Sequence, residues 1–272
     1  ITDSNPMRDN HFLSEIVPWG NHAEDPAARG AARALRRYLL WAGRTLADHP
    51  LNWSRAGRGL EPINGMVTQR AGRLKPMARF SERFGMRGLC LAGGSMFRGL
   101  AAYSGLDFQA VPDGPDQGLV LARRLALARE SLGDYDFVHV HTKAPDEAAH
   151  KKDPVLKMRV IEELDRGLQP ELDRLLEDPE VLLVLCSDHS TPSGGNLVHS
   201  GEPVPLCFCG DGVRRDRVER FDEVSAAGGA LGCVRGREMM YLILNHLDRI
   251  RLEGIRDCPA DRDFWPGDYR PF

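Results

Sequence analysis

Apolar residues recur along the chain in two patterns, helical spacing and short continuous runs. In residues 26–48, Ala and Leu repeat at helical spacing and predict an amphipathic helix, which the His49-Pro50 pair ends. From residue 77 onward, short apolar runs alternate with amphipathic segments. The runs MRGLCLA, LDFQAV, YDFVHV, VLLVLC and PVPLCFC predict strands. The segments that predict helices are 77–85, 95–105, 117–132, 153–177 and 236–254.

The alternation of strands and helices predicts an α/β fold. The first two runs and the helix between them form a β-α-β unit, which implies a parallel sheet with a right-handed crossover. Residues 1–76 do not follow this rhythm. Residues 1–25 are polar and irregular, and residues 51–76 are rich in Gly and Arg with little periodicity, which predicts a long ordered loop. We therefore expect two domains, 1–76 and 77–272.

Composition limits the classes of protein to which the chain can belong. Its 272 residues, 42% hydrophobic and 28% charged, are typical of a soluble globular protein. No apolar run approaches the ~20 residues of a transmembrane helix, and no signal peptide is visible. The net charge of −3 indicates neither a nucleic-acid surface nor a membrane surface. The six cysteines have no CxxC pair or disulfide spacing, which predicts reduced, mostly buried thiols in a cytoplasmic protein.

Carboxylate and imidazole side chains gather around the third and fourth predicted strands. Asp146 and His150 follow the third strand at the start of a helix, where positions i and i+4 share one face. Asp188 and His189 follow VLLVLC, at the expected carboxyl end of a buried parallel strand, where ligands commonly bind. His199 comes after a Gly-rich turn that can fold it back. These oxygen and nitrogen ligands suit Mn²⁺, Zn²⁺ or Fe better than Ca²⁺.

Each of these features alone has an ordinary structural explanation. An Asp-x-x-x-His spacing is common by chance, and Asp188 would also serve as a cap of the following turn. Three ligand-bearing segments in one α/β unit nevertheless favour a metal site over separate surface pairs. His139 and His141 share a face of the third strand. We interpret His139 as a partly buried strand residue and leave His141 open between that role and support of a metal ligand.

Three segments together carry a family resemblance: HTKAPDEAAHKKDP, SDHSTPSGG and HSGEPVP. They resemble the metal-binding segments of the cofactor-independent phosphoglycerate mutases, archaeal-type branch, within the alkaline phosphatase superfamily. TDSNP, ADHPLN, QRAG and FSERFGMRGLCLAGGSMFRGLAAYSGLDF have counterparts in the same order, so the resemblance covers nearly the whole chain. It implies an alkaline phosphatase-like sheet flanked by helices at 77–272. Residues 1–76 would be part of an inserted substrate-binding domain.

The resemblance also implies a reaction. The family transfers a phosphoryl group between two divalent metals, commonly Mn²⁺, with Zn²⁺ or Mg²⁺ as alternatives, and converts 3-phosphoglycerate to 2-phosphoglycerate through a phosphoserine. By this resemblance Asp146, His150 and His199 would bind one metal, and Asp188 and His189 the other.

The implied substrate is a small phosphorylated molecule. Arg70 of QRAG, with Arg55 and Arg73, would bind it, since arginine grips phosphate and carboxylate bidentately. The family's Gly/Thr-rich segment after the GLDF-like strand appears as PDGPDQG, without a matching Lys.

In this family the second metal is completed by an Asp and by the nucleophilic Ser, both well before the TDSNP-like segment. This sequence contains no such region, so the nucleophile is not assigned to any residue, Ser190 included. Three explanations stay open: a fragment, a missing half on another polypeptide, or lost chemistry. The absence of an initiator Met favours a fragment.

Three functions are therefore carried forward. The first is a phosphoglycerate mutase-like phosphotransferase. The second is a phosphomonoesterase or phosphonate-processing hydrolase on the same scaffold, and the third is a catalytically inactive metal-binding scaffold. Besides the substrate, the expected partner is the missing N-terminal segment or a second copy in a homo-oligomer. Nucleic acid and membrane are not expected partners.

Overall fold

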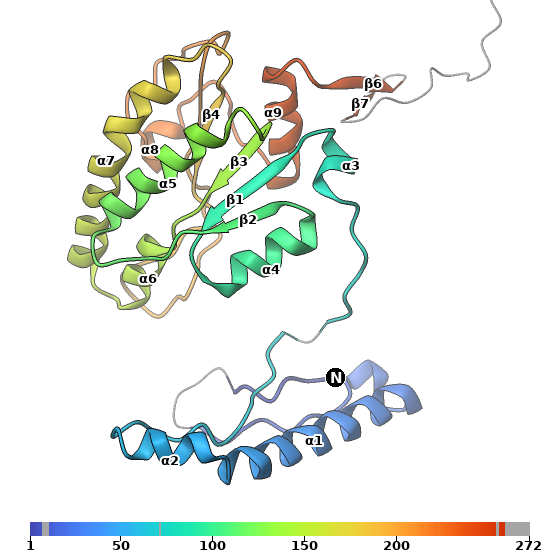
Figure 1. Cartoon of the computed structure of the whole chain (residues 1–272). Coiled ribbons are helices and arrows are strands. Elements are labelled where there is room, and N and C mark those ends of the chain that lie inside the picture. Colours follow the sequence, from blue (N-terminus) through green and yellow to red (C-terminus); the bar gives the residue numbers. More distant parts are fainter. Residues whose placement is uncertain (7–10, 71, 254–255, 259–272) are drawn as a thin grey trace, which may run out of the picture. The chain divides into compact units, whose positions relative to one another are not determined.

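The structure is a computed structural model, which describes residues 1–6, 11–70, 72–253 and 256–258. The chain divides into two compact units, Ile1–Pro76 and Met77–Phe272 (Figure 1). No helix in these described ranges is long and apolar enough to cross a membrane.

The described part of the first unit contains two helices and a short 3₁₀ turn, η1 (Gly20–His22). Helix α1 (Pro26–Ala47) matches the predicted amphipathic helix, and the Asp25 carboxylate caps it by accepting the N–H of Ala27 at 2.8 Å. Helix α2 (Pro50–Ala56) lies where the sequence predicted loop, so that part of the expectation is wrong. At seven residues the helix is too short to show a periodic pattern.

Side-chain hydrogen bonds order the rest of the first unit. Asn52 of α2 donates to the carbonyl oxygens of Leu46 at 2.6 Å and Ile63 at 2.9 Å, and its own carbonyl accepts the N–H of Ile63 at 2.9 Å. The buried Ser4 hydroxyl accepts the N–H of Thr68 at 2.8 Å. These bonds tie residues 57–70 to α2 and residues 1–6 to residues 57–70. The buried polar groups thereby gain the partners that they require.

The second unit is built on a three-stranded parallel sheet. Its strand order is β2 (Asp107–Ala110), β1 (Gly88–Ala92), β3 (Phe137–Val140). The central strand β1 is buried along its whole length and packs on both faces. Leu89 and Leu91 join one apolar cluster with Ala128, whereas Cys90 and Ala92 join another with Ala101. The parallel β-α-β arrangement predicted from the sequence is therefore confirmed.

Helices cover this sheet. The second unit contains α3 (Phe80–Phe84), α4 (Gly94–Ser104), α5 (Gln117–Ser131), α6 (Ala144–His150), α7 (Pro154–Leu176), α8 (Glu223–Ala226), α9 (Met239–His246) and the 3₁₀ turn η2 (Gly236–Glu238).

Ala101 places α4 on one face of β1, and Ala128 places α5 on the other. Helices α5 and α7 lie side by side (Figure 1). Glycines permit this close approach, because a Cβ on Gly167 would stand 2.1 Å from the carbonyl oxygen of Gly118.

Strand β4 (Leu183–Cys186) pairs antiparallel with β5 (Leu206–Cys209). Both strands were predicted, but the expectation of a buried parallel strand before Asp188 is wrong, since β4 is only half-buried and its hydrogen-bonded partner is antiparallel. An apolar run does not specify its pairing partner. Among the five cysteines whose side chains the structure describes, all free thiols, only Cys90 is buried, so the expectation of mostly buried thiols is also wrong.

The last predicted helix is shorter than expected. Segment 236–254 contains η2 and α9, which ends at His246, and then β6 (Arg251–Glu253), paired antiparallel with β7 (Arg256–Cys258). Residue 254 lies outside the described residues. Leu247 is the C-cap of α9, and Asp248 directly after it adopts a left-handed backbone with φ of 53°. This conformation ends a helix.

Candidate metal centre

Helix α6 brings two of the predicted ligands onto one face. It begins after the three residues that follow the end of β3, with Pro145 in its first turn, where a missing N–H costs nothing. Asp146 and His150 are one turn apart, and His150 Nε2 lies 3.3 Å from Asp146 Oδ1. This is the contact that helical i, i+4 spacing predicts.

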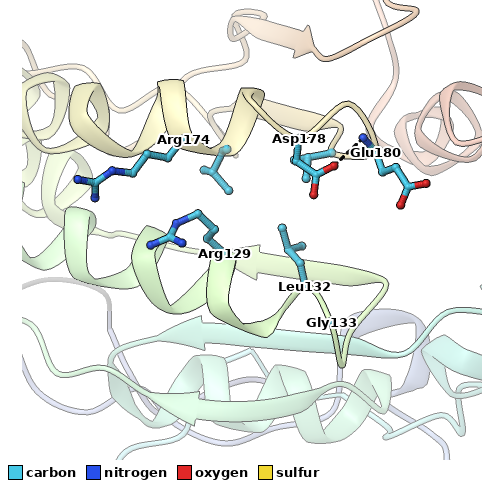
Figure 2. Close-up of a pocket in the computed structure, with 8 residues that line it drawn as sticks. Arg129, Leu132, Gly133, Arg174, Asp178 and Glu180 are labelled. Carbon is cyan, nitrogen blue, oxygen red and sulfur yellow. Dashed lines mark hydrogen bonds between the residues drawn. The ribbon is translucent and has the colours of Figure 1, made fainter.

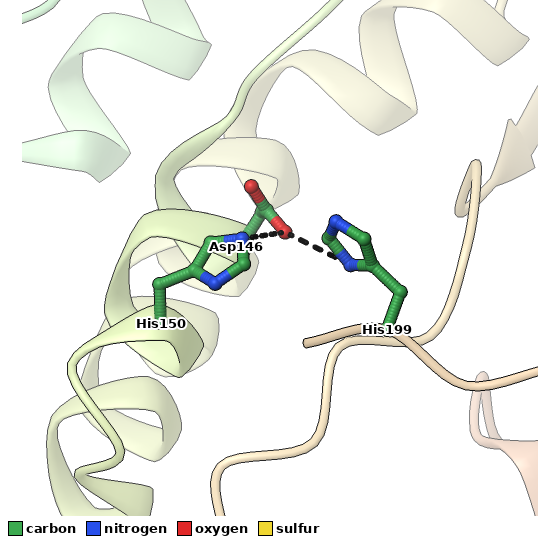
Figure 3. Close-up of side chains that lie close together, drawn as sticks. All are labelled: Asp146, His150 and His199. Carbon is green, nitrogen blue, oxygen red and sulfur yellow. Dashed lines mark ion pairs between the residues drawn. The ribbon is translucent and has the colours of Figure 1, made fainter. Parts of the chain in front are cut away.

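A loop brings the third predicted ligand to the same carboxylate. His199 follows β4 by thirteen positions of irregular chain, and its Nδ1 atom lies 3.8 Å from Asp146 Oδ1 (Figure 3). One ligand atom from each of Asp146, His150 and His199 falls within 4.8 Å of the others. Atoms that share one ion at about 2.1 Å are spaced by roughly 3 to 4 Å, so small side-chain rotations let this set fit a divalent ion.

The second predicted pair lies against the first cluster. His189 Nε2 is 3.5 Å from Asp188 Oδ2, and the rings of His189 and His199 have centroids 4.3 Å apart. Asp188 is the most exposed of the predicted ligands, with 63% of its side chain accessible. All five predicted metal ligands are thus gathered at one place in the second unit.

The side chain at the middle of this cluster is one that sequence reasoning missed. Thr191 is 4% exposed, and its hydroxyl lies 2.7 Å from Asp146 Oδ1. The same oxygen lies 3.1 Å from the Nδ1 atoms of both His189 and His199. In the sequence, Thr191 before a proline is typical of an ordinary turn. Its place within the ligand-rich segment SDHSTP was the one available signal.

Two lysines hold the loop that carries these residues. Lys157 of α7 donates to the carbonyl oxygen of Thr191 at 2.9 Å. Lys152, in the turn between α6 and α7, donates to the carbonyl oxygens of Pro192 at 2.9 Å and Leu197 at 2.5 Å. Hydrogen bonds from a charged group are stronger than neutral ones, so these contacts fix the loop against α6 and α7.

Opposing effects set the charge of the central carboxylate. Partial burial pushes the pKa of Asp146 upward, but the hydrogen bond from Thr191 and the nearby His150 push it down. The Lys143 ammonium, 3.8 Å from Asp146 Oδ2, adds to the lowering. The resulting pKa is below the ordinary value, so the carboxylate is ionised at neutral pH, as a metal ligand must be.

A buried arginine of α5 holds the segment that joins β3 to α6. Arg124 of α5 is fully buried and donates to the carbonyl oxygens of His141 at 2.8 Å and Val111 at 2.6 Å, and to the Asp113 carboxylate at 2.7 Å. His141 stacks on Phe97 with ring centroids 3.9 Å apart. Burial lowers the pKa of His141 to about 4. His141 is therefore a neutral, packed side chain at neutral pH.

The predicted substrate arginines all lie in the first unit, whereas the predicted metal ligands lie in the second. Arg55 is half-buried and its Nε donates to the carbonyl oxygen of Glu61 at 2.8 Å. Arg70 and Arg73 are exposed. Arg70 has a left-handed backbone, φ 56°, and its N–H donates to the Asp3 carboxylate.

A separate pocket lies between the ends of α5 and α7 (Figure 2). Its lining includes Arg129 and Arg174, the kind of residues that would bind an anion. Both arginines already face the buried Glu171 carboxylate, with N–O distances of 3.5 Å for Arg129 and 2.7 Å for Arg174. Together with Asp178 and Glu180, which also line the pocket, Glu171 outweighs the two positive charges, so the pocket is not a candidate phosphate site.

A parallel sheet flanked by helices, with carboxylate and imidazole side chains gathered beside it, is typical of an α/β metalloenzyme. Residues 59–246 match the model of the Metalloenzyme superfamily, and the chain belongs to this superfamily.

Its curated relatives include the 2,3-bisphosphoglycerate-independent phosphoglycerate mutase 2 of Methanocaldococcus jannaschii, 40% identical over 272 residues, and the mutase of Methanopyrus kandleri, 35% identical over 257 residues. The matches cover 98% and 93% of this chain, and 60% of each relative. The chain thus spans about 60% of the length of these relatives.

Solved structures agree with this assignment. The PH0037 protein from Pyrococcus horikoshii is similar with a TM-score of 0.70 and 32% identity, over 85% of this chain and 61% of that one. A cofactor-independent phosphoglycerate mutase from Thermoplasma acidophilum is similar with a TM-score of 0.53 and 27% identity, over 90% of this chain and 58% of that one. The family resemblance and the fold class predicted from the sequence are both confirmed.

Proposed function

We propose that this chain carries the metal-binding part of a 2,3-bisphosphoglycerate-independent phosphoglycerate mutase, which interconverts 3-phosphoglycerate and 2-phosphoglycerate. The observation that carries the proposal is the convergence of Asp146, His150 and His199 from two distant segments onto one point. The reaction is proposed because the relative from Methanocaldococcus jannaschii, 40% identical over almost the whole chain, is named as this mutase. The pathway would be glycolysis and the compartment the cytoplasm, in keeping with the free thiols of the described residues.

We propose that the site holds two divalent ions, Mn²⁺ in preference to Zn²⁺ or Mg²⁺. Asp146, His150 and His199 would bind the first ion, a mixed carboxylate and imidazole set that suits Mn²⁺. Asp188 and His189 would bind the second, with further ligands from outside this sequence. Bound ions would lower the pKa of a serine nucleophile and neutralise the oxygens of the transferred phosphoryl group.

For the substrate, we propose that Arg70, Arg55 and Arg73 contact the phosphate and carboxylate groups of phosphoglycerate. The exposure of Arg70 and Arg73 leaves their guanidinium groups accessible to a ligand. A guanidinium matches the geometry of either anionic group by two parallel hydrogen bonds.

Metal content tests the first half of the proposal. The purified chain is expected to retain close to one Mn²⁺ after gel filtration, and Asp146→Asn is expected to abolish this binding. Glu147→Gln is the matched control, since Glu147 is the next, exposed carboxylate of α6. Two tightly bound ions in this chain alone would contradict the assignment of only two ligands to the second site.

³¹P nuclear magnetic resonance tests the reaction, using the natural polypeptide that contains this sequence. With Mn²⁺ present, the signal of 3-phosphoglycerate is expected to convert to that of 2-phosphoglycerate without release of inorganic phosphate. Release of phosphate without isomerisation would identify a phosphomonoesterase instead. Metal binding without either change would identify an inactive scaffold.

A further inference from the structure

The Thr191 hydroxyl is bonded to members of both predicted metal-binding sets. It contacts Asp146 and His199, assigned to the first ion, and His189, assigned to the second. We propose that Thr191 is a positioning residue that holds His189 and His199 in the Nδ1–H tautomer, which presents the Nε2 atom of each ring to metal. This inference rests on the proposed function for its metal-binding consequence. The tautomers themselves are a property of the metal-free chain.

The hydrogen count of the hydroxyl leads to this assignment. A threonine hydroxyl has one hydrogen to donate and two lone pairs that accept. The Asp146 carboxylate can only accept when ionised, so the 2.7 Å contact uses the hydroxyl hydrogen. Both histidine contacts, at 3.1 Å, must then place the hydrogen on the ring nitrogen. A neutral imidazole carries one N–H, so each Nε2 keeps a free lone pair.

The count has a consequence for the Asp188–His189 pair. Its Nε2 atom lies 3.5 Å from Asp188 Oδ2. With the ring hydrogen on Nδ1, both of these atoms are acceptors, and two facing acceptors are favourable only with a cation or a bridging donor between them. With its hydrogen bond to Nδ1, Thr191 therefore leaves His189 Nε2 and the Asp188 carboxylate as two acceptors that can bind one cation.

The position of Thr191 is fixed independently of the ligands. The residue is 4% exposed, and Lys157 bonds its carbonyl oxygen at 2.9 Å. The backbone carbonyl of the neighbouring Ser190 accepts the N–H of Ser200 at 3.1 Å, which holds the segment after His199 against it. A buried hydroxyl on an anchored backbone keeps its direction, so it selects one tautomer rather than following the rings.

Nitrogen spectroscopy of the metal-free chain tests the tautomers. The chain is labelled with ¹⁵N-histidine and examined at pH 8, where histidines of ordinary pKa are neutral. We expect the His189 and His199 rings to show the Nδ1–H pattern, the minority form of free histidine, and both should lose it in Thr191→Val. Thr191→Ser keeps the hydroxyl and should keep the pattern. His189→Gln and His199→Gln each remove one of the two signals and assign them.

Metal affinity gives the second readout. Removing a partner that orients metal ligands typically weakens binding by about 10- to 100-fold, and we expect this loss of Mn²⁺ affinity in Thr191→Val. Thr191→Ser should stay close to the wild-type affinity. Circular dichroism of both variants separates this effect from a failure to fold.

The outcomes separate this inference from the proposed function. Nε2–H at the His189 or His199 ring of the wild-type chain, or an unchanged Nδ1–H pattern of these two rings in Thr191→Val, would overturn the role of Thr191, whatever metal the chain binds. Nδ1–H rings in a chain that binds no divalent ion would keep that role and overturn the proposed metal site instead.

Discussion

Replacement of Gly167 by Ala tests whether α5 and α7 pack as closely as their glycines indicate. In an exposed helix this change would stabilise the protein by about 1 kcal/mol, because alanine is the better helix former. Here the new Cβ would stand 2.1 Å from the carbonyl oxygen of Gly118 and 2.7 Å from its Cα. Both neighbours are backbone atoms, which cannot rotate away as a side chain would.

Relief of this clash requires the two helices to separate. Overpacking of this kind costs about 1 to 3 kcal/mol, and a rigid backbone neighbour places the cost at the upper end. After subtraction of the helix-propensity gain, Gly167→Ala should lower the free energy of unfolding by about 2 kcal/mol. Urea unfolding followed by far-ultraviolet circular dichroism measures this difference.

Gly99 in α4 offers the matched control. A Cβ at Gly99 meets no heavy atom within 4 Å, so Gly99→Ala should raise the free energy of unfolding by about 0.5 to 1 kcal/mol. The close packing would be refuted if Gly167→Ala were as stable as the wild type while Gly99→Ala showed its expected gain.

Three further results are expected. Lys157→Met removes the bond to the Thr191 carbonyl and should weaken Mn²⁺ binding about tenfold in a titration, whereas Lys151→Met, at an exposed neighbour, should not. Burial, with help from His139, lowers the pKa of His141 from 6.5 to about 4. As pH falls from 6.5 to about 4, the unfolded chain therefore protonates His141 before the folded chain does. The free energy of unfolding should drop by about 1 to 2 kcal/mol over this pH range, allowing for solvent screening, and His141→Gln should remove the drop. An unchanged pH profile would contradict the buried neutral ring. Mn²⁺ at about 100 times its dissociation constant should raise the free energy of unfolding by about 2.7 kcal/mol, seen as a higher Tm that a chelator reverses; no shift would exclude binding to the folded state.

The sequence by itself determined which side chains are candidate metal ligands. Asp146 and His150 could be found because a helix places positions i and i+4 on one face, whatever the rest of the chain does. The strand β1 could be found in the same way, since a short apolar run bounded by glycine predicts a buried strand. Such rules depend on neighbours along the chain, so they need no tertiary information.

Short elements and pairings were decided by the tertiary structure. Helix α2 has too few residues to show a period, and hydrogen bonds from Asn52 to Leu46 and Ile63 tie it to the chain around it. Strand β4 has the apolar pattern of a buried parallel strand but pairs antiparallel with β5. The same pattern is compatible with either partner, and only the three-dimensional arrangement selects one.

The centre of the site shows this division most sharply. Each predicted ligand was recognisable from its chemistry, but Thr191 looks like a turn residue in the sequence. Its hydroxyl joins Asp146, His189 and His199 only when α6 and the loop after β4 meet. Ligand identity is a property of single residues and their local spacing. The hydrogen bonds that orient those ligands are contacts between distant segments, and these exist only in the folded chain.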